Sequence, residues 1–132
     1  MLKLEIVTPE KRVLDAEVDS VSVPTASGEA GILPNHAPLI SALKPGVLSY
    51  TTKGSTEKLA ISGGFVEVNS NKVAVLADTA ETAADIDVDA ARAEREAAEK
   101  ALSAAGGSVE DSEAIRSQID AANVRIQVAT GK

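Results

Sequence analysis

Few residues in this sequence have side chains suited to catalysis or metal binding. His36 is the one histidine, and it lies between Pro34 and Pro38 in a segment predicted to be a loop. The sequence has no cysteine, which excludes a thiolate nucleophile, a disulfide and a cysteine metal site. A general base must lie within hydrogen-bond reach of the proton that it abstracts. A lone loop histidine is therefore more typical of a structural or contact residue than of a base.

The glycine and aspartate motifs do not complete a nucleotide or cation site. Residues 53–55 (Lys-Gly-Ser) have the wrong order for a phosphate-binding loop, and Gly63-Gly64 lacks the third glycine and the helix of a dinucleotide fingerprint. The alternating aspartates at 85, 87 and 89 resemble a calcium loop, but its sixth position, which requires glycine, is Ala90. We interpret the glycines as a turn or bulge and the aspartates as helix caps. The residues thus predict no catalytic site and no metal site.

Composition excludes several classes of partner. The 132 residues include 13 basic and 20 acidic side chains, a net charge of −7, and 2% aromatic residues. Nucleic-acid binding needs a basic surface and aromatic rings for stacking. No segment approaches the ~20 apolar residues of a membrane-spanning helix, and the charged start Met1–Glu5 does not resemble a signal peptide. We therefore expect no nucleic-acid binding and no direct membrane insertion, so that any membrane contact goes through a partner.

The elements that position these residues change type near residue 84. All five prolines lie in the first 45 residues, and ten of the 14 valines lie at or before Val75, whereas 14 of the 23 alanines lie in the last 50 residues. Valine favours strands and alanine favours helices. We predict a β domain at 1–84 and a helical region at 85–132.

Alternating apolar residues predict short strands in the first part. Leu2, Leu4 and Ile6 share one face, and Val73 and Val75 follow a predicted turn at residues 69–71. Gly54-Ser55 is a second hairpin-turn signal. Several short strands at close spacing indicate an all-β sandwich or barrel, and the scarcity of aromatic residues predicts an aliphatic core.

The second part is predicted to be two antiparallel helices. The first helix runs from Val88 to Ala105 with a Glu96–Lys100 ion pair, and Gly106-Gly107 ends it. Asp111 or Ser112 caps the second helix, which has Ile115, Ile119, Ala122 and Ile126 on one face. Because the stripes are mostly alanine, and one buried CH₂ contributes only about 0.8 kcal/mol, we expect weak docking of this hairpin on the β domain and a capacity to detach.

Two segments resemble a known family. Residues 27–39 read Ser-Gly-Glu-Ala-Gly-Ile-Leu-Pro-Asn-His-Ala-Pro-Leu, and residues 63–68 read Gly-Gly-Phe-Val-Glu-Val. They resemble the signature segments of the epsilon subunit of F-type ATP synthases, which is called delta in mitochondria. The chain length and the order of β domain and helices are similar as well, so the resemblance covers the whole chain.

The resemblance implies a fold and a role. The family has a ten-stranded β-sandwich followed by an antiparallel two-helix hairpin. It is a non-catalytic rotor subunit of the central stalk, where it binds the gamma subunit and the ring of c subunits and couples proton flow to ATP synthesis. In bacteria and chloroplasts the hairpin extends toward the alpha/beta catalytic head and inhibits ATP hydrolysis. The implied location is peripheral, at the cytoplasmic face of the bacterial plasma membrane in preference to the plastid thylakoid.

The resemblance also implies contact residues in the loop 28–34 and just beyond it. The expected c-ring contacts are Gly28, Glu29, Ala30 and Gly31, and the expected gamma contacts are His36, Ala37 and Leu39. The c-ring contact would be polar and modest, so that avidity over several c-ring loops is needed. The alternative is that the glycines and prolines only shape a turn, although rigid loops commonly carry binding as well.

The family's ATP-binding motif, Ile or Leu followed by Asp-x-x-Arg-Ala, is matched by residues 88–93 except for the valine at its start. The resemblance implies an ATP site formed by Asp89, Arg92, Ala93 and Arg125, since arginine pairs with phosphate. Positions 99 and 121, where the family has further arginines, are Glu and Ala here. We expect regulatory ATP of low affinity and no required cofactor. The alternative is that Asp89 and Arg92 form an i,i+3 helix ion pair.

The residues also allow a second function of a different class. The chain would then be a stand-alone β-sandwich adaptor whose helical hairpin joins the coiled coil of a partner. The segment 28–38 favours the rotor subunit, whereas a protein that is free in the cytosol and does not associate with membranes would favour the adaptor.

Overall fold

The computed structural model describes residues 1–104 and 109–130 and contains strands, a short 3₁₀ helix and two long helices. The strands are β1 (Leu2–Val7), β2 (Arg12–Val18), β3 (Ser20–Thr25), β4 (Gly28–Ile32), β5 (Leu39–Leu43), β6 (Gly46–Thr52), β7 (Ser55–Ile61), β8 (Gly64–Asn69), β9 (Lys72–Ala77) and β10 (Ala80–Thr82). The helices are η1 (Ala83–Asp85), α1 (Val88–Ala104) and α2 (Val109–Thr130). The predicted boundary between 84 and 85 falls inside η1.

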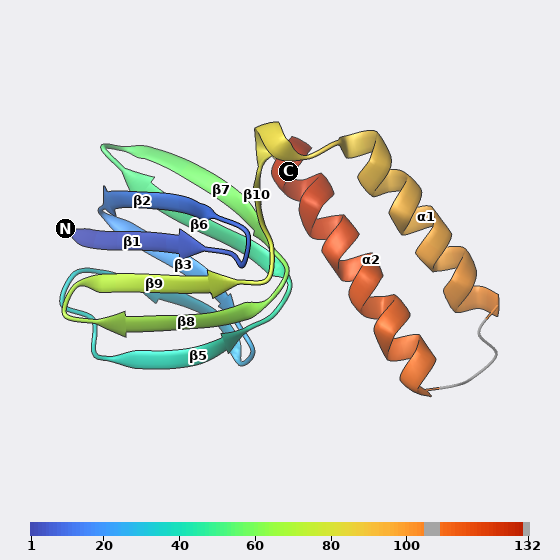
Figure 1. Ribbon diagram of the computed structural model, residues 1–132, viewed down its shortest axis with the longest axis horizontal. Helices are drawn as coiled ribbons and strands as arrows, with labels where there is room; N and C mark the ends of the chain where they lie inside the picture. Colours follow the sequence, from blue (N-terminus) through green and yellow to red (C-terminus); the bar gives the residue numbers. More distant parts are fainter. Residues whose placement is uncertain (105–108, 131–132) are drawn as a thin grey trace.

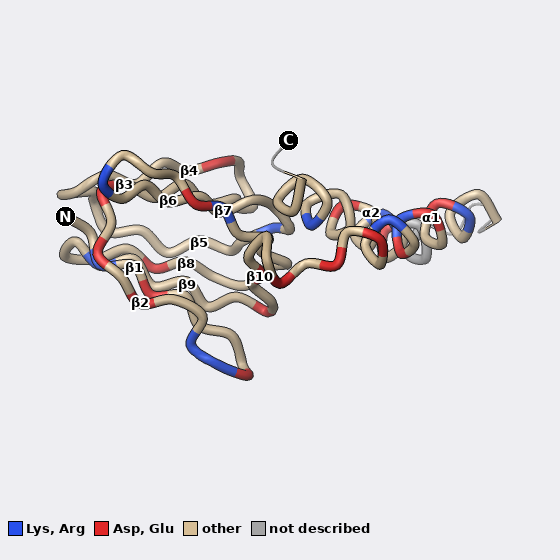
Figure 2. The backbone as a smooth tube through the Cα atoms, turned by 90° about the horizontal axis from the view of Figure 1, so that it is seen from above, with Lys and Arg blue, Asp and Glu red and all other residues tan. Residues whose placement is uncertain are grey.

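The ten strands form a sheet that folds over into two layers, with the helices at one end (Figures 1 and 2). The strand order is β10-β7-β6-β3-β5-β8-β9-β1-β2, and β4 pairs with β3. The pairing is antiparallel except between β1 and β9, which run parallel. The predicted β-sandwich of about ten strands followed by a two-helix hairpin is therefore confirmed.

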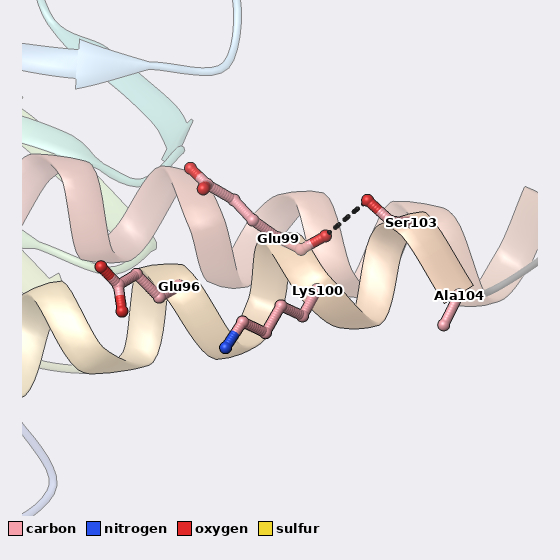
Figure 3. A pocket seen from close by; sticks show the side chains of 5 residues that line it. All are labelled: Glu96, Glu99, Lys100, Ser103 and Ala104. Atoms are coloured by element: carbon pink, nitrogen blue, oxygen red, sulfur yellow. Dashed lines mark hydrogen bonds between the residues drawn. The ribbon is translucent and has the colours of Figure 1, made fainter.

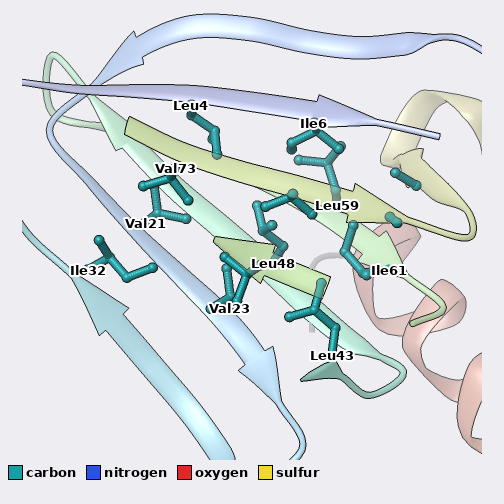
Figure 4. Close-up of a cluster of buried hydrophobic side chains, with 14 of the residues drawn as sticks. Leu4, Ile6, Val21, Val23, Ile32, Leu43, Leu48, Leu59, Ile61 and Val73 are labelled. Carbon is teal, nitrogen blue, oxygen red and sulfur yellow. The ribbon is translucent and has the colours of Figure 1, made fainter. Parts of the chain in front are cut away.

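The core lies between the two layers and is aliphatic (Figure 4). Leu2, Leu4 and Ile6 are fully buried in β1, as their alternation predicts, and Val73 and Val75 are fully buried in β9. Each buried aliphatic side chain contributes roughly 1.5–3 kcal/mol relative to its exposed state. Since successive strand residues face opposite sides, the same alternation also determines which side chains lie on the outside.

Two hairpin turns use residues with positive φ. Lys53 and Gly54 have φ of 51° and 80°, and Ser70 and Asn71 have φ of 53° and 61°. Two-residue hairpins favour turns with φ > 0 at both central positions because their twist matches that of the strands. The turn predicted at Gly54-Ser55 is thus displaced by one residue, since Ser55 already pairs with Thr52 in the ladder.

The first helix of the hairpin begins where the sequence predicts, but the second helix begins earlier than predicted. Asp87 caps α1, because its Oδ1 accepts a hydrogen bond of 3.0 Å from the Ala90 N–H. The predicted end at residues 105–107 lies outside the described residues. The second helix already begins at Val109, two residues before the first predicted cap, so residues 111 and 112 lie within it rather than at its cap.

α1 has an ion pair one residue before the predicted one. Among the described residues, Glu96 and Lys100 form no ion pair, whereas Arg95 Nε lies 4.0 Å from Glu99 Oε1. Arg95 also reaches the second helix and donates to Asn123 Oδ1 at 3.2 Å. Arg95 therefore joins α1 to α2.

α2 is the helix that lies against the sandwich, where it contacts β6, β7 and β10. A small apolar cluster joins the two parts, with Ala60, Ile86 and Val128 buried and Val47, Val124 and Ala129 partly buried around them. A cavity of about 60 Å³ remains beside this cluster, lined by residues of β7, β10 and α2. The contact is thus smaller and less completely packed than the sandwich core.

Candidate partner-binding surfaces

The segment expected to be a c-ring loop is mostly a strand. Gly28–Ile32 forms β4 and pairs with β3 along its whole length. Glu29 and Gly31 are exposed, whereas Ala30 is half-buried and packs against the core. The expectation of a loop was wrong because pairing with β3 supplies the backbone hydrogen bonds that the glycine-rich sequence does not predict. The strand presents Glu29 and Gly31 fully, and Ala30 in part.

Glu29 lies at the edge of a hollow between the sandwich and α2. The Ser22 hydroxyl donates a hydrogen bond to its Oε1. The hollow has a volume of about 460 Å³. Its lining includes Lys44 and Lys58 of the sandwich and Gln127 of α2. Its charged lining residues are Glu29 and the two lysines.

The segment expected to contact the gamma subunit joins β4 to β5. His36 is half-exposed, and its Nδ1 lies 2.6 Å from the Ala37 carbonyl oxygen, while Ala37 itself is exposed. Leu39 starts β5 and packs partly against the core, so its neighbour Ile40, 75% exposed, presents the apolar side chain at this place. The apolar side chains that this place exposes most are Leu33, at 62%, and Ile40, while those of residues 36 and 39 are partly accessible.

An exposed apolar row crosses the layer formed by β5, β8, β9 and β1. Ala42 faces Phe65, Phe65 faces Leu76, and Leu76 faces Val7 on the successive strands. Phe65 and Leu76 are 57% and 58% exposed. We call these four residues the apolar row. The sequence pattern did not indicate this row, although Phe65 alternates with the buried Val66 and therefore has to face outward.

Charged residues border the apolar row. The half-buried Glu5 carboxylate lies 3.6 Å from both Lys3 Nζ and Lys72 Nζ, and Glu67 is exposed on β8. An apolar centre with a polar rim is the usual anatomy of a protein–protein interface. Large exposed apolar side chains in register on neighbouring strands mark an interaction surface.

Among the described residues, no hydrogen bond or ion pair joins the four residues of the expected ATP site to one another. Asp89, Arg92 and Ala93 are exposed on α1. Arg125 on α2 donates from Nη1 to Glu94 Oε2 at 2.9 Å and from Nη2 to Glu81 Oε2 at 3.3 Å. Its Nε lies 2.9 Å from Glu81 Oε1, but this buried N–H is not aligned for a hydrogen bond, so the contact is electrostatic. The sequence did not predict Glu81 and Glu94 as partners.

The alternative for Asp89 and Arg92 is not observed either. Within residues 1–104 and 109–130, these two side chains form no ion pair. A hollow of about 470 Å³ does lie on α1, but Glu96, Glu99, Lys100, Ser103 and Ala104 line it (Figure 3). None of the expected ATP residues belongs to it. The low-affinity ATP site stays a prediction.

Asp85 accepts the hydrogen bonds that cap the short 3₁₀ helix between the sandwich and the hairpin. The Thr82 hydroxyl and backbone N–H donate to Asp85 Oδ2 at 2.9 Å and 3.3 Å. These two hydrogen bonds, the hydroxyl's first, hold the pKa of Asp85 below its ordinary value of 3.8. In the sandwich, partial burial and then the carboxylate of Glu57, its partner across the ladder, raise the pKa of Tyr50 above 10.0.

In the part of the chain that the structure describes, no group of three or more His, Cys, Asp or Glu side chains is arranged to hold a metal ion. Neither of the described helices is long and apolar enough to cross a bilayer.

Comparison with known proteins agrees with the fold. Residues 1–83 match the family described as ATP synthase, Delta/Epsilon chain, beta-sandwich domain. The ATP synthase epsilon chain of Desulfitobacterium hafniense is 56% identical over 99 residues, 75% of this chain and 75% of that relative. The ATP synthase epsilon chain of Herpetosiphon aurantiacus is 48% identical over 128 residues, 97% of this chain and 93% of that relative.

A solved structure shows the same fold. A chain of the Euglena gracilis mitochondrial ATP synthase, in an assembly with OSCP and the c-ring, matches this structure with a TM-score of 0.83 and 22% sequence identity. The match covers 98% of this chain and 81% of the Euglena chain. The sequence relatives decide against the stand-alone adaptor. The chain belongs to the delta/epsilon chain family of the F-type ATP synthase.

Proposed function

We propose how this chain, a central-stalk subunit of the F-type ATP synthase by its family, contacts its neighbours. The sandwich binds the gamma subunit through the apolar row and the c ring through β4. The hairpin acts on the alpha/beta catalytic head. In this role the chain transmits rotation between the c ring and the head and supplies no catalytic group of its own. It is peripheral, on the cytoplasmic face of a bacterial membrane.

The apolar row is the observation that carries the gamma contact. Three of its residues are exposed and Val7 is half-buried, and the four lie in register on neighbouring strands bordered by charges. Burial of an exposed leucine or phenylalanine contributes roughly 1.5–3 kcal/mol, so two such side chains supply a central anchor for an interface. The expected gamma contacts His36, Ala37 and Leu39, together with the exposed Ile40, extend the same contact along the start of β5.

The c-ring contact is polar and of a different kind. Glu29 and Gly31 are the exposed positions of β4, and neither offers apolar area. A single contact of this type is weak, and repetition over several c subunits would supply avidity. Gly28 and Ala30, the other two expected contact residues, act through the shape of the strand.

The hairpin is the regulatory part in this proposal. α2 is attached to the sandwich by a small apolar cluster and by Arg125, so detachment leaves the sandwich core intact. A detached hairpin extends toward the catalytic head and inhibits ATP hydrolysis. ATP of low affinity, through Asp89, Arg92, Ala93 and Arg125, would favour the docked hairpin by binding that state alone.

Gamma binding is tested with full-length variants and isolated gamma subunit. Ala42→Glu places a charge in the middle of the apolar row, and Leu76→Ser removes one of its anchors. The matched control is Thr56→Glu, which adds the same charge at an exposed position of β7. We expect at least about tenfold weaker binding for the first two and unchanged binding for the control. Equal binding by all three would refute the gamma surface.

The braking role is tested with ATP synthase that has been depleted of this subunit. Added full-length chain is expected to lower the rate of ATP hydrolysis. Ala121→Pro interrupts α2, at a cost of about 3 kcal/mol to the helix, and should bind equally well without inhibiting. Equal inhibition by this variant would show that the hairpin is not the brake.

A further inference from the structure

Arg125 joins three elements at the place where the hairpin meets the sandwich. It belongs to α2, its Nη1 contacts Glu94 of α1, and its Nη2 and Nε contact Glu81 of β10. Its side chain is 22% exposed, and that of Glu81 is 28% exposed. We call these three residues the Arg125 triad.

We propose that Arg125 is the latch that holds the hairpin on the sandwich, with Glu81 as its fixed partner and Glu94 as the partner that orients it. The guanidinium is planar and presents several donors in fixed directions. It can therefore bind two carboxylates from two elements at once. The arrangement connects both helices to the last strand of the sandwich.

The triad has no substitute among the described residues. The other ion pairs there lie within the sandwich, as for Glu5 with Lys3 and Lys72, or within α1, as for Arg95 with Glu99. The apolar contact beside the triad is small, and the cavity of about 60 Å³ is lined by Arg125 and Glu81 themselves. Among the described residues, this partly buried contact is therefore the one ion pair between the hairpin and the sandwich.

The triad also makes the docked hairpin independent of an added anion. Arg125 is the α2 residue of the expected ATP site, and the carboxylates of Glu81 and Glu94 already neutralise its charge. A nucleotide phosphate would have to displace Glu81 or Glu94 before it could bind there. The consequence for regulation rests on the proposed braking function: the resting position of the hairpin is set by residues of the chain rather than by ATP.

The absence of native cysteine provides a direct test on the full-length chain. Val128→Cys introduces a thiol that is covered while α2 is docked, since Val128 is 4% exposed. Its rate of reaction with a thiol reagent, measured at several reagent concentrations, reports the fraction of undocked hairpin. Val75→Cys, fully buried in β9, reports opening of the sandwich in a separate chain.

Four substitutions are compared in each of these two backgrounds. Arg125→Gln and Glu81→Gln break the latch from its two sides. Arg95→Gln is the matched control, because Arg95 joins α1 to α2 without contacting the sandwich, and Glu94→Gln breaks only the contact within the hairpin.

We expect Arg125→Gln and Glu81→Gln to accelerate labelling at position 128 about tenfold, as for the loss of one charged hydrogen bond. The double variant should be no faster than either single variant, since both remove the same contact. Arg95→Gln and Glu94→Gln should change the rate less than about threefold.

Two results would overturn the latch. One is unchanged labelling at position 128 in both latch variants, and the other is equal acceleration at position 75, which would mean general destabilisation of the sandwich. The assay uses the chain alone, so its outcome is separate from that of the hydrolysis experiment.

Discussion

Gly64 offers the sharpest test of how the sandwich is built, because three glycines of this chain differ in one respect at a time. Gly64 has φ of +121°, and a Cβ added there would lie 1.9 Å from the Leu76 carbonyl oxygen. Gly28 has φ of +129° with nothing within 4 Å of the added atom, and Gly31 has neither a positive φ nor a close neighbour. The series thus separates backbone strain from steric conflict.

The expected costs follow from these environments. A positive φ in a residue with a side chain costs about 1–3 kcal/mol, which sets the loss for Gly28→Ala. In Gly64→Ala the Leu76 carbonyl would also have to retreat by about 1 Å, which disrupts the pairing of β8 with β9 and adds about 1–3 kcal/mol or more. Gly31→Ala should change the free energy of unfolding by less than about 1 kcal/mol, because it also reduces the entropy of the unfolded chain.

The assay is urea unfolding of the full-length chain followed by far-ultraviolet circular dichroism, with the midpoint and slope fitted for each variant. We expect the order Gly64→Ala, then Gly28→Ala, then Gly31→Ala, with Gly64→Ala about 3–5 kcal/mol less stable than the parent. A Gly64→Ala variant within 0.5 kcal/mol (about the additivity error of such data) of Gly28→Ala would refute the steric argument.

Three further predictions concern titration and ligand binding. Thr82→Val removes the hydroxyl donor to Asp85 and should raise the pKa of that carboxyl toward 3.8 in an NMR titration. Because the pKa of Asp85 is lower in the folded chain, its contribution to stability is present above pH 3.8. That contribution is lost as the pH falls through the lowered pKa. The phenolate absorbance of Tyr50 should appear above pH 10.0, and Glu57→Gln should lower the pKa of Tyr50 only in part, because burial is the larger cause of its rise. Since the pKa is higher in the folded chain, the stability of the fold declines as the pH rises beyond 10.0. ATP at about 5 mM should stabilise the hairpin by only about 0.2 kcal/mol if its Kd is about 10 mM, and a shift of several degrees in the hairpin's melting temperature would contradict this.

The sequence was most informative where one face of an element meets the core. The alternation of Leu2, Leu4 and Ile6 predicts a half-buried strand, and every one of these side chains is fully buried. The start of α1 was predicted as well, because a cap such as Asp87 acts on amides only a few residues away. In both cases the physical cause lies within a short stretch of chain.

The sequence was least informative where the cause lies far along the chain. β4 exists because β3 pairs with it, although its own residues favour a loop. The partner of Arg125 on the sandwich is 44 residues away at Glu81, and no periodicity of the helix indicates it. The apolar row is intermediate: alternation places Phe65 outside, but only the register of the neighbouring strands brings it beside Leu76.

The alanine-rich hairpin and the Arg125 triad are two parts of one physical requirement. A regulatory element must dock reproducibly and still leave its site when a partner offers a competing surface, which requires a gap of only a few kcal/mol between its states. A stripe of leucines would exceed that gap, because each would add roughly 1.5–3 kcal/mol. The two valines and one alanine that α2 places in the small apolar cluster keep the apolar contribution small, but a small apolar contact is not very directional. The triad supplies the direction, because Arg125 reaches Glu81 and Glu94 together only when both helices are correctly placed. Weak apolar packing combined with one geometrically demanding charged contact therefore gives a hairpin that is well positioned and readily released.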